Sequence, residues 1–444
     1  MRVKRLPKDP GPAGWDKLLP RRDPTAPLSE EIDTDWLVIG AGFAGLAAAQ
    51  RLSQLNPTDR VTILEAVQVA SGPAGRNSGF MIDLPHDLTS NDYGGDADRD
   101  RAQIRANRHA IAYAHEIAEA AGLGVESFDP CGKVNGAATE KGQAHNASYA
   151  AHLASLGEPC ETLNATDMRA MTGSDYYRGG LFTPGTVVIQ PAAFIQGWAA
   201  SLVSNRVTLY ESSPVTALEP DAGGWRAQTP AGAVRAAKVI LAVNGHIASF
   251  GVRARALMHV FTYASMTRAL TGTEVARLGG QARWGITPAD PMGSTVRRVS
   301  GPGGARIVIR SRFTYEPSLE VSDAALARVV RTHDAGFAAR FPMLRGVEME
   351  HRWGGRLCLT RNGVGLVEEA RPGLWTACVQ NGLGTVRGIL SGLAAAEAAS
   401  GRVSEITRQV MAEPAPVRLP PEPIATLGAR AVLRWNEWRA GREL

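Results

Sequence analysis

TDWLVIGAGFAGLAAAQRL, residues 34–52, joins an apolar run to a glycine-rich turn and then to a helix-forming segment. The run DWLVIG has no polar alternation, which is typical of a parallel strand buried on both faces. RVTILEA follows at residues 60–66 as a second short strand that ends in Glu65. A strand, a G-x-G-x-x-G turn, a helix and a second strand in this order predict the βαβ opening of a dinucleotide-binding domain.

Each glycine of this turn has a separate physical task. Gly40 permits the tight turn, Gly42 allows a pyrophosphate to approach the backbone, and Gly45 lets the helix and the strand pack closely. The helix that starts here presents free N–H groups to a diphosphate. Glu65 can accept hydrogen bonds from a ribose diol. A carboxylate at this position also disfavours a 2′-phosphate, and hence NADP. The alternative is a glycine-rich turn in another α/β protein, and the turn alone does not separate FAD from NAD.

The composition argues against several classes of function. A chain of 444 residues suggests two or three packed units. No window approaches the roughly eighteen consecutive apolar residues of a membrane span, and the basic N-terminus lacks the apolar core of a secretory signal. Arginines are scattered among carboxylates, as in DADRDRAQIRANR, so nucleic-acid binding is not expected. The cysteines form no metal-ligand or redox pair, and we expect free thiols in a cytoplasmic protein: Cys131, Cys160, Cys358 and Cys378.

The rest of the chain alternates predicted strands with a few helices. Residues 1–33 are rich in proline and charge and predict an irregular arm. Apolar spacing predicts helices over 101–121, 190–204, 323–341 and 381–401, and a surface helix over 429–444. Between residue 122 and about residue 185 we expect short strands and loops. Further strands are expected over 206–220, 225–230, 236–245, 259–270, 305–317 and 349–359.

Several longer stretches resemble one family. TDWLVIGAGFAGLAAAQRL and VTILEA are similar to its FAD-binding start, and GRNSGF at 75–80 to its second glycine segment. SSPVTALE resembles the strand that holds the adenine, and AAKVILAVNGH the strand that returns to the flavin. HRWGGRLCLTRNGVGLVE and WTACVQNGLGTVRGILSG resemble its C-terminal segment around the isoalloxazine, and Trp15 in the arm fits the same subgroup. This is the D-amino-acid oxidase and sarcosine oxidase superfamily of FAD-dependent amine oxidoreductases, and the likeness is greatest to gamma-glutamylputrescine oxidase-type members.

The resemblance implies an α/β fold with an α+β second domain. A discontinuous Rossmann-like FAD-binding domain would comprise residues 34–125, 180–250 and 345–415. A smaller antiparallel-sheet substrate domain would comprise 126–179 and 251–344. The arm at 1–33 would precede them, and a helical tail at 416–444 would follow.

The resemblance also implies a non-covalent FAD and the residues that hold it. The expected cofactor-binding residues are Gly40, Gly42, Phe43, Ala44, Gly45, Glu65, Ala66, Arg76, Asn77, Ser78, Gly79, Val215, Asn244, Gly245, Gly355, Asn381, Gly382, Leu383, Gly384 and Thr385.

Residues 72–88, GPAGRNSGFMIDLPHDL, combine small residues with an Arg-Asn pair and an apolar Phe-Met-Ile. We expect Gly75 and Gly79 to let the backbone approach the FAD, with Arg76 and Asn77 as polar contacts. Ser78 stands where the family has a second glycine. For His86 a pocket position and a surface position both stay open.

The reaction implied by the resemblance is oxidation of a C–N bond of a primary or secondary amine to an imine, and then to an aldehyde or ketone. Hydride would pass to flavin N5, and O₂, giving H₂O₂, or another acceptor would reoxidise the flavin. The protein supplies orientation, a dry pocket and electrostatics.

Polar side chains on the strands after residue 255 are the candidates for contacting the substrate. Alternation by two residues places His259 and Tyr263 on one face of a strand, and His351 and Trp353 come just before the flavin-facing turn. These four are the expected catalytic residues. The alternatives are that His259 is a structural histidine and that the two aromatic side chains are core residues. The expected substrate-binding residues are Arg310, Arg312 and Arg356.

Two departures from the family pattern affect the substrate and the electron acceptor. The family's amino-acid oxidases hold the substrate carboxylate with the arginine of a G-L-R-P segment, which here reads GRLC, with Arg356 one place early. This favours an amine over an α-amino acid. Sarcosine oxidases of this superfamily place a lysine near flavin N5 to activate oxygen, but no lysine follows Lys238 in this sequence. Both an oxidase and a dehydrogenase therefore stay open. Cys358 lies near the region where some relatives attach the flavin covalently, but its spacing to Thr360 differs from theirs, which favours non-covalent FAD.

Two alternatives to an amine oxidoreductase remain. One is an amino-acid oxidase or dehydrogenase whose arginines hold the carboxylate. The other is a flavin-binding subunit of a hetero-oligomeric dehydrogenase, so a second subunit, like a homo-oligomer, remains a possible partner.

Overall fold

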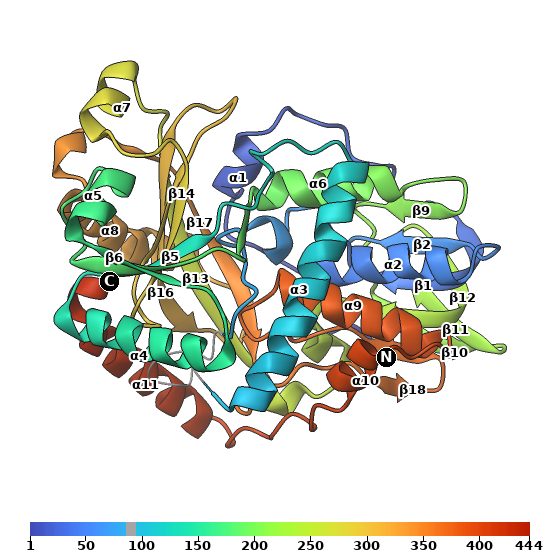
Figure 1. Cartoon of the computed structure of the whole chain (residues 1–444). Helices are drawn as coiled ribbons and strands as arrows, with labels where there is room; N and C mark the ends of the chain where they lie inside the picture. Colours follow the sequence, from blue (N-terminus) through green and yellow to red (C-terminus); the bar gives the residue numbers. More distant parts are fainter. Residues whose placement is uncertain (86–94) are drawn as a thin grey trace.

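The computed structural model describes residues 1–85 and 95–444, and His86 therefore lies outside the described residues. These residues form two sheets of eight strands each and one sheet of three strands. In Figure 1 the first large sheet lies in the right-hand lobe and the second in the left-hand lobe. Within the described ranges, no helix is both long and apolar enough to cross a membrane.

The first sheet is built around the strand predicted from the opening motif. β1 (Glu31–Ile39) lies parallel to both β12 (Ala233–Leu241) and β2 (Val61–Leu64). Its end, Trp36 to Ile39, is buried on both sides, which explains the continuous apolar run and confirms the prediction. The other strands are β9 (Val207–Tyr210), β10 (Ala217–Asp221), β11 (Gly224–Gln228), β18 (Glu369–Arg371) and β19 (Leu374–Thr376).

Two helices of this lobe pack at very short range. α2 (Phe43–Leu55) follows the glycine turn, and α9 (Val386–Ala399) comes from the far end of the chain. A Cβ atom on Gly392 of α9 would lie 2.2 Å from the carbonyl oxygen of Ala44, so only glycine permits this approach. The remaining helices of this lobe are α3 (Ala97–Ala120), α6 (Pro191–Leu202) and α10 (Glu405–Met411), with the short α1 (Gly14–Lys17) of the arm beside α6.

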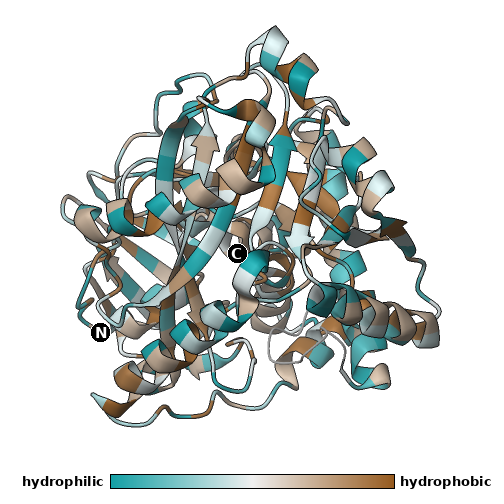
Figure 2. Ribbon diagram, turned by 90° about the vertical axis from the view of Figure 1, so that its left-hand side faces the viewer, coloured by the Kyte–Doolittle hydropathy of each residue, from teal (hydrophilic) through white to brown (hydrophobic). Residues whose placement is uncertain are grey.

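The second sheet is almost wholly antiparallel, and the pair β14–β5 is parallel. In spatial order it holds β17 (Met349–Leu359), β13 (Met258–Thr267), β16 (Arg306–Tyr315), β15 (Thr295–Val299), β14 (Trp284–Pro288), β5 (Lys133–Ala137), β7 (Gly179–Thr183) and β6 (Glu161–Asn164). Figure 2 shows helices of mixed hydropathy over strands that carry hydrophobic residues. Among the helices of this lobe, α8 (Asp323–Arg340) and α11 (Ile424–Ala440) pack against strands of the sheet, and α7 (Gly272–Leu278) lies beside the 3₁₀ turn Pro342–Leu344 that follows α8.

The three-stranded sheet contains the second glycine segment. It consists of β3 (Phe80–Met81), β8 (Val187–Ile189) and β4 (Phe128–Asp129), all paired antiparallel. Phe80 and Met81 are buried, so the apolar residues that follow Arg76 and Asn77 belong to the core.

The expectation of strands and loops alone between residues 122 and 185 was wrong. The structure has α4 (Glu140–Leu156) and α5 (Ala165–Thr172) in this region. α4 buries few large apolar residues, chiefly Tyr149 and Leu153, so its periodicity is weak. The informative signals are its ends, where Thr139 caps the first turn and Gly157 closes the last at φ 77°.

The domain boundaries remain a prediction. Two strands from sequence ranges predicted for the FAD-binding domain belong to the second sheet. β17 lies inside block 345–415 and β7 opens block 180–250, yet both pair within the second sheet.

Candidate active site

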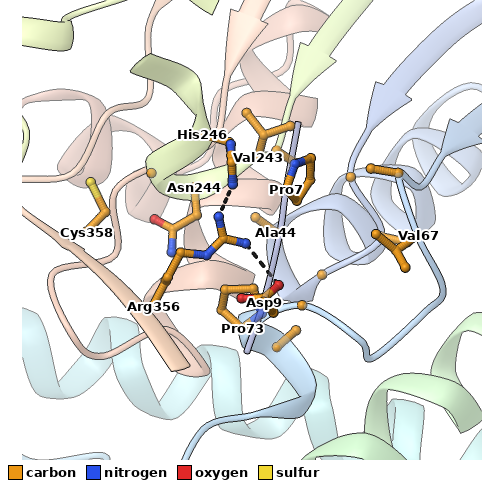
Figure 3. A pocket seen from close by; sticks show the side chains of 18 of the residues that line it. Pro7, Asp9, Ala44, Val67, Pro73, Val243, Asn244, His246, Arg356 and Cys358 are labelled. Carbon is orange, nitrogen blue, oxygen red and sulfur yellow. Dashed lines mark hydrogen bonds and ion pairs between the residues drawn. The ribbon is translucent and has the colours of Figure 1, made fainter. Parts of the chain in front are cut away.

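A cleft opens where the carboxyl ends of the first sheet's parallel strands face the second sheet. Its walls come from the glycine turn, the segment after β2, the 3₁₀ helix η2 (Asn244–Phe250), strands β13 and β17, and the start of α9. Residues 3–9 of the N-terminal arm form a further wall. Figure 3 shows Pro7 and Asp9 of this arm facing Asn244, His246 and Arg356 across the cleft.

The three glycines of the opening motif have different neighbours. Gly40 has φ 104°, and a Cβ there would lie 2.7 Å from the carbonyl oxygen of Ala242. A Cβ on Gly45 would overlap the carbonyl oxygen of Gly40 at 1.7 Å. At Gly42 the nearest atom is the Cβ of Ala74, at 3.5 Å, and the residue lines the cleft. The fold itself requires Gly40 and Gly45, whereas Gly42 keeps the cleft open.

Glu65 lies in the cleft next to this turn. Its carboxylate accepts hydrogen bonds from the backbone N–H of Ala41 at 2.9 Å and of Val67 at 3.2 Å. Burial raises the pKa of Glu65 above its usual value. Ala66 and Val215 also line this end of the cleft. The arrangement fits a ribose diol, which can donate to the carboxylate.

Two helices begin at the cleft without a side-chain cap. α2 starts after Gly42, which has no side chain to offer. α9 starts after Thr385, whose hydroxyl instead donates to the carbonyl oxygen of Phe80 at 2.7 Å. Most other long helices are capped, for example α3 by Asp96 and α8 by Ser322. The uncapped N–H groups of α2 and α9 are therefore available to an anionic or electron-rich ligand.

The approach to α9 is open. A Cβ on Gly384 would have no atom within 4 Å, and Gly382 and Gly384 both line the cleft. Asn381 contributes to the shape of this loop: its side chain accepts from the N–H of Thr360 at 2.8 Å and donates to the carbonyl oxygen of Val364 at 2.6 Å. The cleft therefore suits a dinucleotide: the free N–H groups of α2 could hold a diphosphate, and those of α9 an electron-rich ring.

The glycines of the second segment serve the protein's own packing. A Cβ on Gly75 would lie 2.0 Å from the carbonyl oxygen of Ala70. A Cβ on Gly79 would lie 2.1 Å from Nη1 of Arg297 and 2.3 Å from the carbonyl oxygen of Ile189. These glycines are thus needed because of protein atoms, and the expected close approach to FAD does not explain them.

Arg76 is buried and holds segments together. Its guanidinium donates to the carbonyl oxygens of Pro10 and Gly354, each at 3.2 Å, and of Gly11. Asn77 lines the cleft, but its side chain forms a local turn with Ala74 and Gly79. The carbonyl oxygen of Ser78 accepts from Arg297 at 2.7 Å.

Arg356 lies in the cleft and is already paired. Its Nη2 donates to Oδ2 of Asp9 at 3.0 Å, and its Nη1 donates to Nε2 of His246 (Figure 3). Because a guanidinium only donates, Nε2 of His246 must accept, and the proton of this neutral ring then sits on Nδ1. Burial, with the positive charge of Arg356, lowers the pKa of His246 to about 3.

His259 is a neutral imidazole at the same place. Burial lowers its pKa to about 4, and the charges of Arg356 and Arg5 act in the same direction. Four buried polar atoms here have no hydrogen-bond partner among the described residues: Nδ1 of His259, Nδ1 of His246, Oδ1 of Asp9 and Nε of Arg356. Buried polar groups are normally satisfied, so this set indicates that a polar ligand belongs in the cleft.

The comparison with protein families identifies the chain. Residues 35–398 match the model of the family DAO, described as FAD dependent oxidoreductase. The chain belongs to the DAO family. FAD is therefore its cofactor, and the cleft is the candidate for its binding site.

Other DAO proteins resemble the chain over most of its length. The probable oxidoreductase OrdL of Rhizobium meliloti (strain 1021) is 25% identical over 423 residues, 90% of this chain and 91% of the relative. Gamma-glutamylputrescine oxidoreductase of Escherichia coli (strain K12) is 25% identical over 346 residues, 75% of this chain and 76% of the relative. The crystal structure of glycine oxidase from Geobacillus kaustophilus shares the fold, with a TM-score of 0.68, 21% identity, and coverage of 84% of this chain and 96% of that one.

Sixteen of the predicted site residues meet in the cleft of this DAO protein. The lining includes, from the prediction, Gly40, Gly42, Phe43, Ala44, Glu65, Ala66, Arg76, Asn77, Val215, Asn244, Gly245, Gly355, Gly382, Gly384, His259 and Arg356. Six further predicted residues lie within two positions of these in the chain and shape the same loops and helix starts: Gly45, Ser78, Gly79, Asn381, Leu383 and Thr385.

Three predicted catalytic residues lie elsewhere in the DAO fold. Tyr263 packs with Phe261 and Val330 against α8, and its hydroxyl lies 2.6 Å from that of Thr314. Trp353 is a core residue whose indole N–H donates to the carbonyl oxygen of Arg76 at 3.0 Å. His351 is half-buried, and its Nε2 lies 3.7 Å from the carboxylate of Glu350.

The arginines of β16 also lie away from the cleft lining. Arg312 pairs with Glu437 of α11 at 3.1 Å. The guanidinium of Arg310 lies over the ring of Phe313, 5.1 Å from its centroid.

Three residues of the site were not predicted from the sequence. Asp9 and Arg5 belong to the arm, for which only irregular structure was expected, and His246 follows the predicted Asn244–Gly245 pair directly. His246 could have been predicted, because it directly follows the segment AAKVILAVNG, which resembles the family's strand that returns to the flavin. Asp9 carried no such local signal.

Proposed function

We propose that this DAO protein oxidises a C–N bond of a primary or secondary amine that carries no α-carboxylate, giving an imine and then an aldehyde or ketone. When bound, FAD supplies the two-electron acceptor for this reaction. The name of the Escherichia coli relative, gamma-glutamylputrescine oxidoreductase, supports an amine-derived substrate, while that of glycine oxidase points to an amino acid.

The pairing of Arg356 with Asp9 and His246 carries the proposal. A free arginine in a buried cleft would attract a substrate carboxylate through charge-assisted hydrogen bonds. Here a carboxylate of the chain itself already occupies the guanidinium at 3.0 Å. A substrate carboxylate could reach only the unpartnered Nε of Arg356, beside the negative charge of Asp9, or would have to displace Asp9 and leave that carboxylate buried and unpaired.

The same residues suit a cationic amine. Oδ1 of Asp9 has no partner within the described part of the chain and can accept from a substrate ammonium. His259 stays neutral at physiological pH because burial keeps its pKa at about 4, so its unpartnered Nδ1 can accept an amine N–H. Together the two acceptors would orient the nitrogen, while the arm and β17 exclude water.

An α-amino acid is the second candidate, and Arg5 is the observation that favours it. Arg5 lines the cleft from the arm, is exposed, and donates to the backbone carbonyl oxygen of Ser318 without an acidic partner among the described residues. A carboxylate held by Arg5 would lie at the mouth of the cleft, with the amine directed inward.

Anaerobic bleaching of the holoenzyme tests the proposal. Amines and the corresponding α-amino acids are added in turn, the loss of flavin absorbance is followed, and air is then admitted. We expect amines to bleach the flavin and amino acids of equal chain length to leave it oxidised. Bleaching by amino acids alone would contradict the proposal, and rapid recovery with H₂O₂ would identify an oxidase. Bleaching by no substrate until a second polypeptide is added would favour a subunit of a larger enzyme.

A further inference from the structure

α11 carries an apolar face that points away from the body of the protein. Ile424 is 61% exposed, Leu427 65%, Trp435 58% and Trp438 72%. The rings of Trp435 and Trp438 lie 5.1 Å apart between centroids and form one continuous patch. Single exposed apolar side chains are common on protein surfaces, whereas contiguous exposed apolar patches usually mark an interaction site. We therefore expect a binding partner at this face.

The spacing of these residues makes a narrow stripe. At 100° per residue, positions 424, 427, 431, 435 and 438 fall within a sector of about 80° on the helix, and Val432, which is also 58% exposed, lies about 60° beyond one edge of it. Leu433 and Ala440, which are half-buried and buried, lie on the opposite side. The apolar stripe therefore faces solvent, and a different face of the helix packs against the protein.

Arginines border the stripe on both sides. Arg430 and Arg434 fall on one flank and Arg439 on the other, and all three are exposed. Glu437 is the single acidic residue of the helix. Its carboxylate faces inward, accepting from Arg312 at 3.1 Å and from the backbone N–H of Phe313 at 3.0 Å. The outward face thus carries positive charge alone around an aromatic centre.

The inward contacts hold α11 firmly on the second lobe. Glu437 makes two of these contacts. Just beyond the end of α11, the buried Glu443 accepts hydrogen bonds from the N–H groups of Ala138 and Thr139 at 3.0 and 2.9 Å. In Figure 1 the helix runs along the outer edge of this lobe. The stripe is therefore presented on a fixed support and accessible along its length.

We propose that this face of α11 docks the enzyme on the surface of an anionic lipid bilayer. An apolar stripe with tryptophans and flanking arginines is the pattern of helices that lie in a membrane interface: the rings enter the headgroup boundary, and the guanidinium groups contact lipid phosphates. A second copy of the chain fits less well, because two such faces would place arginine flanks opposite each other with no outward acid to neutralise them.

Docking at α11 would also orient the enzyme. A second hollow is lined by Glu422 and Ala425, at the start of α11, and by Arg5 and His259, which also line the active-site cleft. The bilayer surface would thus lie close to one approach to the active site. The docking proposal is independent of the substrate class.

Sedimentation of the holoenzyme with vesicles tests the docking. We expect co-sedimentation with vesicles of phosphatidylcholine and phosphatidylglycerol, none with phosphatidylcholine alone, and release by salt. Trp435→Gln with Trp438→Gln should weaken binding at least about tenfold. Changing Arg430, Arg434 and Arg439 to Gln should weaken it about fivefold per arginine. All variants should keep their FAD content and Tm, because the changed side chains are exposed.

Control variants change exposed residues of the same kind elsewhere on the protein. Val203→Gln with Val403→Gln replaces two exposed apolar residues, and a triple variant replaces three exposed arginines: Arg99, Arg105 and Arg361. Both should sediment like the wild type. The proposal fails if the wild type ignores anionic vesicles, or if the tryptophan variant binds as well as its control. It also fails if light scattering shows a dimer that the tryptophan variant alone loses, because the face would then belong to a second copy.

Discussion

Asp9 and Arg356 meet in a 3.0 Å ion pair across the active-site cleft, although 347 residues separate them in the chain. Both side chains are largely buried, at 9% and 7% exposure. The pair ties the N-terminal arm to β17 and neutralises the positive charge that a carboxylate substrate would seek.

Replacing Asp9 by Asn should change which substrates bind. Arg356 would lose its counter-charge, and the amine nitrogen would lose a charged acceptor worth about 1.5–3 kcal/mol. We expect the KM for a cationic amine to rise about tenfold to a hundredfold, with tighter binding of simple carboxylates. Steady-state kinetics and carboxylate titrations of the flavin spectrum measure both effects. Asp23→Asn, at an exposed position of the same arm, is the control, and unchanged values in the Asp9 variant would rule out the assigned role.

Alanine substitutions at the glycines should separate cofactor contacts from packing. Gly42→Ala and Gly384→Ala meet no close protein atom, so the apoprotein should keep its free energy of unfolding while FAD binds about tenfold more weakly. Gly79→Ala should instead unfold the protein or lower its stability by several kcal/mol, because Arg297 and the Ile189 carbonyl occupy the space at φ 77°. Urea unfolding and FAD titration measure the two quantities. A Gly42 variant with normal FAD affinity would be inconsistent with a diphosphate at this turn.

Acid should destabilise the protein before its carboxylates titrate. Burial lowers the pKa of His246, His259 and His333 to about 3, 4 and 3. Below the ordinary histidine pKa of about 6.5 the unfolded chain therefore binds protons that the folded chain does not. The free energy of unfolding should fall by up to about 1.4 kcal/mol per pH unit for each histidine, until the folded values are reached.

His333→Gln tests this dependence outside the active site. Its ring lies against the hydroxyl of Ser265, and its Nε2 is unpartnered within residues 1–85 and 95–444. The Tm of this variant should fall less steeply between about pH 7 and about pH 5 than that of the wild type. His109→Gln, at an exposed position of α3, controls for the loss of an imidazole. Parallel slopes for the wild type and the His333 variant would contradict the burial argument.

The flavin should leave the protein on denaturation. Cys358 lines the cleft, but its thiol is fully buried, and burial raises its pKa far above the usual value. A protonated thiol is a poor nucleophile, so we expect no bond to FAD. Acid precipitation should leave all yellow colour in the supernatant, and Cys358→Ser should bind FAD normally. Flavin that remains with the wild-type pellet and is released by the serine variant would show a covalent bond.

The elements that carry the cofactor could be predicted because their signals are local. The apolar run of β1, the G-x-G-x-x-G turn and Glu65 all fall within about thirty residues, and strand, turn and helix each have their own pattern. The glycines at 75 and 79 were a weaker guide. They do show that something approaches the backbone closely, but the sequence does not say whether it is a ligand or, as here, Ala70 and Arg297.

The substrate side could not be predicted because it depends on register and on distant contacts. Alternation placed His259 and Tyr263 on one face, but β13 has a register shift between Thr262 and Tyr263. His259 lines the cleft, whereas Tyr263 packs against α8. The partner of Arg356 comes from the opposite end of the chain, and no local pattern announces it.

The position of the arm has a consequence for truncation of the chain. Residues 3–9 wall the candidate FAD cleft, and the ion pair of Asp9 with Arg356 fastens them there. Loss of this short segment would uncover one wall of the cleft and leave the guanidinium of Arg356 without its carboxylate partner.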